Sequence, residues 1–169
     1  SAQIEVDGLY FSVDGKNCSV TKNPSGTLYT GDIVIPESVI ISSFSFPDFS
    51  STYAITKSFS FYAGAGSVLS FSCSGDVRAG ASFSFDGNRT GLTNAYGQIK
   101  GSYHIDSTDT GVHTLDFKIN GNTYGWNANL SVSNIVVNLD KETEYPITAI
   151  GSEAFYNCTG LTSIEIPNS

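Results

Sequence analysis

The stretch Ser58-Phe59-Ser60-Phe61 decides the fold, because serine and phenylalanine alternate in it without a break. Alternation with a period of two places the phenylalanines on one face of a strand and the serines on the other. Two further stretches repeat the pattern, Leu69-Ser70-Phe71-Ser72 and Ser82-Phe83-Ser84-Phe85. Each of them predicts a strand with one face buried and one face in water.

Four more segments carry strand-forming residues between turns rich in Gly, Asp and Asn, and they cover residues 44–49, 99–105, 112–119 and 130–139. Together with the three alternating stretches they give seven short strands at roughly even spacing. This spacing predicts a mainly β chain folded as an antiparallel β-sandwich, for which a jelly-roll-like topology is preferred.

The composition supports a folded β protein and excludes some partners. Of the 169 residues 40% are hydrophobic, 12% aromatic and only 14% charged. The net charge of −8 repels phosphate backbones, so nucleic acid is not expected as a partner. No stretch approaches the roughly 20 apolar residues that cross a bilayer, so no transmembrane segment is expected. The start Ser1-Ala2-Gln3 has no signal region, and we expect that a signal peptide has been removed before it.

The three cysteines, Cys18, Cys73 and Cys158, are odd in number and have no Cys-x-x-Cys spacing. The sequence therefore predicts neither a disulfide framework nor a zinc site. We expect each cysteine to act as a small buried hydrophobic residue.

The two ends of the chain lack the alternation of Ser and Phe that marks the middle. Residues 4–14 alternate in polarity and end at Asp14-Gly15, which predicts a strand, a tight turn and a return strand through Cys18 and Val20. Near the start Ile33-Val34-Ile35-Pro36-Glu37-Ser38 looks like Ile164-Glu165-Ile166-Pro167-Asn168-Ser169 at the end, which indicates an internal repeat.

The run from Ile147 to Pro167, Ile-Thr-Ala-Ile-Gly-Ser-Glu-Ala-Phe-Tyr-Asn-Cys-Thr-Gly-Leu-Thr-Ser-Ile-Glu-Ile-Pro, resembles one BspA-type leucine-rich repeat of bacterial surface proteins. Residues 31–37 resemble the entry segment of the same family. The resemblance implies that seven residues point into a solenoid core: Ile150, Ala154, Phe155, Cys158, Leu161, Ile164 and Ile166.

The resemblance also implies a division of the chain. Residues 1–39 would form an N-terminal hairpin and a first partial leucine-rich repeat, and residues 144–169 a complete repeat. Residues 40–143 would then be a jelly-roll-like β-sandwich inserted into the N-terminal part of the leucine-rich-repeat solenoid. Since a solenoid needs a cap, the array is expected to continue beyond Ser169.

A search for catalytic motifs returns little. The sequence contains no Gly-x-Ser-x-Gly elbow, no Walker loop and no His-Glu-x-x-His. Of the two histidines, His113 is in phase with Leu115 and is expected to point inward, whereas His104 is expected to be exposed. No spacing selects a pair of carboxylates, so we expect no enzyme, and a β-sandwich glycoside hydrolase is the least favoured alternative.

The candidate ligand site is the segment 120–127, where Tyr124 and Trp126 adjoin the amides of Asn122 and Asn127. Aromatic faces pack on sugar rings while amides bind hydroxyls, so this mixture suits a carbohydrate. The alternative is that Trp126 closes the end of the sandwich core.

Asp106 and Asp109 are candidate ligands for a structural calcium ion, and no other cofactor is expected. Taken together, the sequence predicts a non-enzymatic binding or adhesion protein of a bacterium, secreted or at the cell surface. It would engage a protein or glycan ligand on a host or microbial surface. The alternative is a carbohydrate-binding module on a repeat scaffold.

Overall fold

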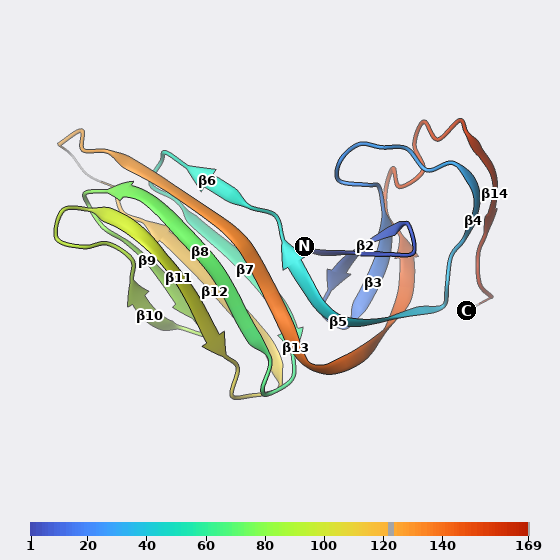
Figure 1. Ribbon diagram of the computed structural model, residues 1–169, viewed down its shortest axis with the longest axis horizontal. Helices are drawn as coiled ribbons and strands as arrows, with labels where there is room; N and C mark the ends of the chain where they lie inside the picture. Colours follow the sequence, from blue (N-terminus) through green and yellow to red (C-terminus); the bar gives the residue numbers. More distant parts are fainter. Residues whose placement is uncertain (122–123, 169) are drawn as a thin grey trace.

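The computed structural model describes residues 1–121 and 124–168, and it confirms a mainly β chain with antiparallel sheets. In these residues the regular elements are all strands, β1 to β14, and there is no helix. Figure 1 shows a two-layered sandwich on the left and a smaller unit on the right, which carries the C-terminal strand.

One layer of the sandwich is a four-stranded sheet with the order β10-β9-β12-β7. Its strands are β7 (Thr56–Ala63), β9 (Ala81–Phe85), β10 (Asn88–Gly91) and β12 (Gly111–Ile119). All pairings in this layer are antiparallel. In β7 Phe59 and Phe61 are buried while Ser58 and Ser60 are exposed, as the alternation predicts. In β9 Phe83 and Phe85 are buried and Ser84 is half-buried, but Ser82 is buried as well.

The other layer runs β11-β8-β13, and β13 also pairs with β5 and β6. These strands are β5 (Ser38–Phe46), β6 (Phe49–Ser51), β8 (Val68–Val77), β11 (Gln98–Asp106) and β13 (Ala128–Ile150). From β6 to β13 the chain changes layer at every connection except the β9–β10 hairpin. These two strand orders are the ones expected for a jelly roll, whose eight strands divide between two sheets.

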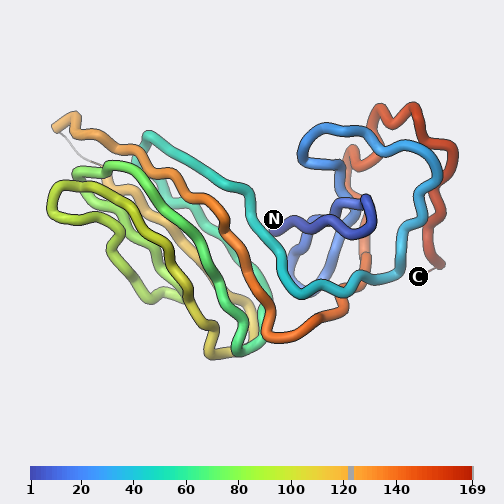
Figure 2. Tube along the Cα trace, viewed as in Figure 1, coloured from blue at the N-terminus to red at the C-terminus, as the bar shows by residue number. Residues whose placement is uncertain are grey.

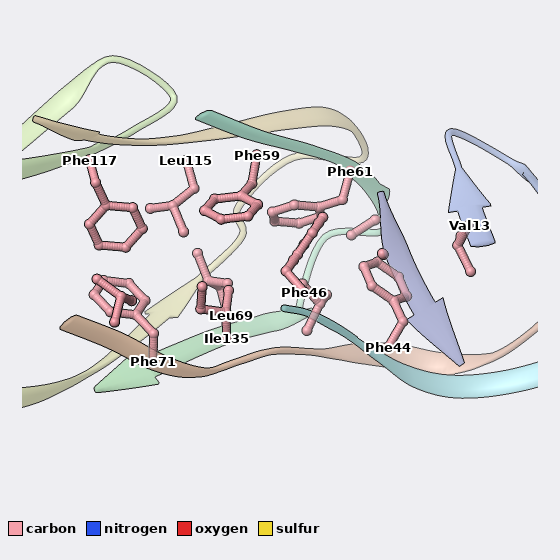
Figure 3. Packing of buried hydrophobic residues seen from close by; sticks show 14 of the residues in the cluster. Val13, Phe44, Phe46, Phe59, Phe61, Leu69, Phe71, Leu115, Phe117 and Ile135 are labelled. Carbon is pink, nitrogen blue, oxygen red and sulfur yellow. The ribbon is translucent and has the colours of Figure 1, made fainter. Parts of the chain in front are cut away.

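Phenylalanine rings fill the space between the layers (Figure 3). Phe71 on β8 lies 5.0 Å, between ring centroids, from both Phe83 on β9 and Phe117 on β12. Phe46 on β5 lies 4.9 Å from Phe59 on β7. Because the partners come from opposite layers, the alternating stretches of the sequence hold the sandwich together.

The smaller unit begins with three antiparallel strands, β1 (Ala2–Val6), β2 (Leu9–Asp14) and β3 (Asn17–Thr21). The expected hairpin at Asp14-Gly15 is confirmed, but residues 4–14 form two strands and not one. Asp7 and Gly8 both have positive φ angles, 49° and 84°, which suits a tight turn between the strands. β3 then pairs in parallel with β13, and β1 meets β5, so the pairings form a closed circuit through five strands.

The expected leucine-rich-repeat solenoid is absent from the described residues. Residues 161–165 form β14 (Leu161–Glu165), which pairs only with β4 (Gly31–Val34) in a two-stranded sheet. Ile150, Ile164 and Ile166, expected in a solenoid core, are 42%, 37% and 60% exposed. The other four residues expected in that core, Ala154, Phe155, Cys158 and Leu161, are buried or half-buried. Parallel pairing in the described residues joins β3 to β13 and β4 to β14, which is one pair of segments and not a series of stacked repeats. This part of the fold prediction is therefore wrong.

The long strand β13 connects the two parts of the molecule, as the orange-to-red tube in Figure 2 shows. Both β5 and β13 run across the boundaries expected at residues 39/40 and 143/144. Their pairing is irregular between Asn138 and Thr143, where the chain leaves the sandwich. Independent folding of residues 40–143 stays a prediction.

The contribution of the phenylalanine core can be tested at Phe117, which contacts four other phenylalanine rings: Phe49, Phe59, Phe71 and Phe83. Phe117→Ala should lower the free energy of unfolding by about 3–5 kcal/mol, because it leaves a cavity between the layers. Urea denaturation measures this loss. Val112→Ala is the control, since Val112 lies on the same strand and is 69% exposed. It should change stability by no more than about 0.5 kcal/mol, and equal losses in the two variants would contradict the packing described.

The three cysteines offer a second test, since all of them are free thiols. Burial raises the pKa of Cys73 to about 12, and burial together with the charge of Asp14 raises the pKa of Cys18 to about 11. The thiolate is the reactive form. At mildly alkaline pH the folded protein should therefore react with one equivalent of a thiol reagent, at the half-buried Cys158, and with three after unfolding in urea. Three equivalents before unfolding would show that the core is open.

Candidate functional site

The segment between β12 and β13 presents two aromatic rings to solvent. Tyr124 is 74% exposed and Trp126 is 46% exposed. Their rings stack on each other with centroids 4.8 Å apart and planes 26° apart. The structure therefore places Trp126 on the surface, and Trp126 does not close the end of the sandwich core.

Of the two amides expected beside these rings, Asn127 lies within the described residues. Asn127 is exposed, and its backbone carbonyl accepts a hydrogen bond from the backbone N–H of Arg78 at 3.2 Å. This bond joins the segment to the turn between β8 and β9. Asn122 lies outside the described residues.

Two exposed tyrosines that the sequence reasoning missed lie on neighbouring loops. Tyr53, between β6 and β7, is 74% exposed, and Tyr96, between β10 and β11, is 70% exposed. We call these loops together the loop end: residues 52–55, 78–80, 92–97, 120–121 and 124–127. Tyr53 and Tyr96 are flanked by Ser, Thr, Asn, Ala and Gly, outside any alternating stretch. That context, an aromatic residue among turn residues, is the signal that could have found them.

Contacts tie the loops of the loop end to one another. The backbone N–H of Asn120 donates to Gly80 O at 3.0 Å, and its side-chain amide donates to Ala79 O at 3.1 Å. Val77 N donates to Gly97 O at 2.7 Å. These bonds hold three loops in fixed relation to the ends of the strands, so exposed rings on them are presented from a supported surface.

An open depression of about 650 Å³ lies within the loop end, between residues 54–56, Ala79 and residues 118–121. Its walls combine the apolar Ile55 and Ile119 with the polar Asn120. A shallow, mixed surface of this kind suits a ligand that is held partly by ring contacts and partly by hydrogen bonds. The loop end therefore has the features of a binding surface.

The buried His113 belongs to another part of the sandwich, and its expected inward position is confirmed. Its Nδ1 lies 2.6 Å from Asp86 Oδ2, and its Nε2 lies 2.9 Å from the backbone oxygen of Asp109. Asp86 also accepts a hydrogen bond from Thr114 N at 2.9 Å. The contact between His113 and Asp86 connects β12 to the β9–β10 turn, which is a structural role. The other histidine, His104, is exposed on β11, as expected.

Asp106 and Asp109, the candidate calcium ligands, are both exposed and line an open pocket that Asp86 also reaches. Among the described residues no group of three or more His, Cys, Asp or Glu side chains is placed to hold a metal ion. The calcium prediction stays untested. Among residues 1–121 and 124–168, no helix is long and apolar enough to cross a membrane.

Comparison with known proteins overturns the resemblance to BspA-type repeats. No protein-family model matches the chain, and no curated protein matches it. The crystal structure of Aeromonas hydrophila PliG, a periplasmic lysozyme inhibitor of g-type lysozyme, is 13% identical, covers 64% of this chain and 96% of its own, and has a TM-score of 0.35. A mutant of PliG-Ec, the corresponding inhibitor from Escherichia coli, is 13% identical, covers 64% of this chain and 99% of its own, and has a TM-score of 0.31.

Because no family model matches the chain and the described residues form no solenoid, the predicted family membership is wrong. A similarity of this degree assigns no function to the chain.

The support of the loop end can be tested at Gly97. A Cβ there would lie 2.7 Å from the Cα of Arg78, whereas a Cβ at Gly87 would meet nothing within 4 Å. The two glycines have nearly equal φ angles, 82° and 83°. Both Gly→Ala variants should lose about 1–2 kcal/mol from the positive φ, and Gly97→Ala should lose more, because two backbones must separate. Equal losses in thermal or urea denaturation would show that these loops are not in contact.

Proposed function

We propose that this chain is a non-enzymatic binding protein that contacts its ligand through the loop end. The observation that supports the proposal is the gathering of four exposed aromatic rings on loops at one end of the sandwich: Tyr53, Tyr96, Tyr124 and Trp126. Large aromatic residues are enriched in the centres of interfaces, and loops on a rigid scaffold commonly carry binding residues.

The distribution of aromatic types supports a recognition surface over an incidental exposure. The chain has 11 Phe, 9 Tyr and 1 Trp. Every Phe is buried or half-buried, whereas the exposed rings are those of Tyr and Trp. A Tyr or Trp ring offers an apolar face and a hydrogen-bonding group with few rotatable bonds, and binding surfaces use it for that reason.

The proposal extends to the class of ligand and to the location of the protein. We infer a protein or glycan ligand on a host or microbial surface, and a protein that acts in adhesion, secreted or at the cell surface of a bacterium. The net charge of −8 favours ligands that are neutral or basic.

A carbohydrate ligand is a second, more specific candidate, favoured by the stacked pair of Tyr124 and Trp126. Aromatic faces pack against the C–H surfaces of pyranose rings, and nearby amide groups bind hydroxyls. The exposed Asn127 adjoins this pair. In this candidate function the stacked pair supplies the platform for a sugar ring.

The test is to screen the protein against a glycan array and against immobilised extracellular-matrix proteins, and to repeat each positive measurement with variants. Trp126→Ala and Tyr124→Ala should each weaken binding at least about tenfold while changing stability by no more than about 1 kcal/mol. Tyr156→Ala is the matched control, because Tyr156 is 66% exposed but lies in the smaller unit, away from the loop end. It should bind like the parent protein.

The outcomes separate the candidates. Because Trp126 is the single Trp, a sugar bound at the pair should change the intrinsic Trp fluorescence on titration. Binding of matrix proteins alone, lost in the loop-end variants, would support the binding proposal and rule out carbohydrate. Binding that survives Trp126→Ala and Tyr124→Ala would contradict the proposal, and turnover of a polysaccharide would replace it with the hydrolase alternative.

A further inference from the structure

A second open pocket lies on the side of the sandwich, where its two sheets separate. It has a volume of about 410 Å³. Phe83 and Phe85 of β9 and Ile105 of β11 give it an apolar floor, and Asp106 and Asp109 lie on its rim. We call this pocket the side groove.

The side groove lies between two edge strands. β10 is the last strand of the four-stranded sheet, and β11 is the last strand of the other layer. Asn88 and Thr90 of β10 face the side groove from one sheet, and Ile105 faces it from the other. The groove is therefore a gap between two edge strands, lined at its base by the buried Phe83 and Phe85 and the half-buried Ile105.

The charge of the side groove is negative. Asp86 also lines it, but its carboxylate is engaged by His113 and Thr114. No Lys or Arg is among the described residues that line the groove. Arg89 lies between two lining residues of β10, so the alternation of a strand directs it to the other face. Asp106 and Asp109 thus leave two carboxylates above an apolar floor.

We propose that the side groove binds a basic side chain, arginine or lysine, of a protein partner. The aliphatic stem of such a side chain packs on Phe83, Phe85 and Ile105, while the cationic head pairs with Asp106 and Asp109. A basic side chain is the residue type that combines an apolar stem with a positive end, which is the combination the groove presents. The net charge of −8 attracts a basic partner over longer distances.

This inference rests on the proposed binding function and adds a second contact surface to it. The side groove is formed where β9 ends at Phe85 and β11 ends at Asp106, whereas the loop end lies at the opposite ends of these strands. The two surfaces share no residue, so variants of one leave the other intact.

The test is a titration of the isotope-labelled protein followed by two-dimensional NMR. The probe is the blocked pentapeptide acetyl-Gly-Gly-Arg-Gly-Gly-amide, and its control has norleucine in place of arginine. The arginine peptide should shift the amide signals of residues 83–90 and 105–109, and added salt should weaken this effect. The norleucine peptide should produce little change at these residues.

The double variant Asp106→Asn with Asp109→Asn should weaken binding of the arginine peptide about tenfold or more. The double variant Asp7→Asn with Asp14→Asn is the matched control, because it removes the same charge from two exposed positions in the smaller unit. It should bind like the parent protein, and so should Trp126→Ala. If Trp126→Ala no longer binds glycans or matrix proteins but still binds the arginine peptide, only the loop end is impaired and the side groove is intact.

Three results would overturn the proposal. Equal weakening in the two double variants would mean that only the net charge matters. Equal shifts by both peptides would remove the role of the cation. Shifts caused by Ca²⁺ but not by the arginine peptide would assign the rim to a metal ion.

Discussion

The contact of phenylalanine rings across the two layers is the interaction on which the rest of the structure depends. Phe46, Phe59, Phe71 and Phe117 meet between the sheets, and each comes from a different strand. These rings reach one another only if each of these four strands directs its alternate residues inward, which fixes the register of β5, β7, β8 and β12. The burial of apolar area between the layers is accordingly the main stabilising contribution to the sandwich.

Because the phenylalanines occupy the inner face, the chain is left with two kinds of site at its borders. Loops at one end of the strands carry the exposed rings of Tyr and Trp, and hydrogen bonds such as that from Arg78 N to Asn127 O support them. Between the edge strands β10 and β11 lies a groove that is lined by core phenylalanines and by the exposed Asp106 and Asp109. Both surfaces follow from the shape of a sandwich, whose core is reachable only at ends and edges.

Much of the sandwich could be predicted from the sequence, since a period of two determines both the strand and its buried face. The turn at Asp7-Gly8 was missed, although the alternation changes phase there, from Ile4 and Val6 before the turn to Leu9, Phe11 and Val13 after it. The expectation of a leucine-rich-repeat solenoid failed because a match over one short segment does not specify which segments stack on it. Ile166, expected in a solenoid core, is exposed as a result. Tyr124 and Trp126 were found from local context, whereas the side groove joins strands distant in sequence and needs the tertiary structure.

Phe side chains form the core, whereas Trp126 belongs to an exposed surface of the loop end. The most direct test is collisional quenching of Trp fluorescence by acrylamide, because the single Trp makes the signal unambiguous. Since Trp126 is 46% exposed, quenching in the native protein should be a substantial fraction of that in the urea-unfolded chain. Native emission that is blue-shifted and nearly insensitive to acrylamide would place Trp126 in the core and contradict the account.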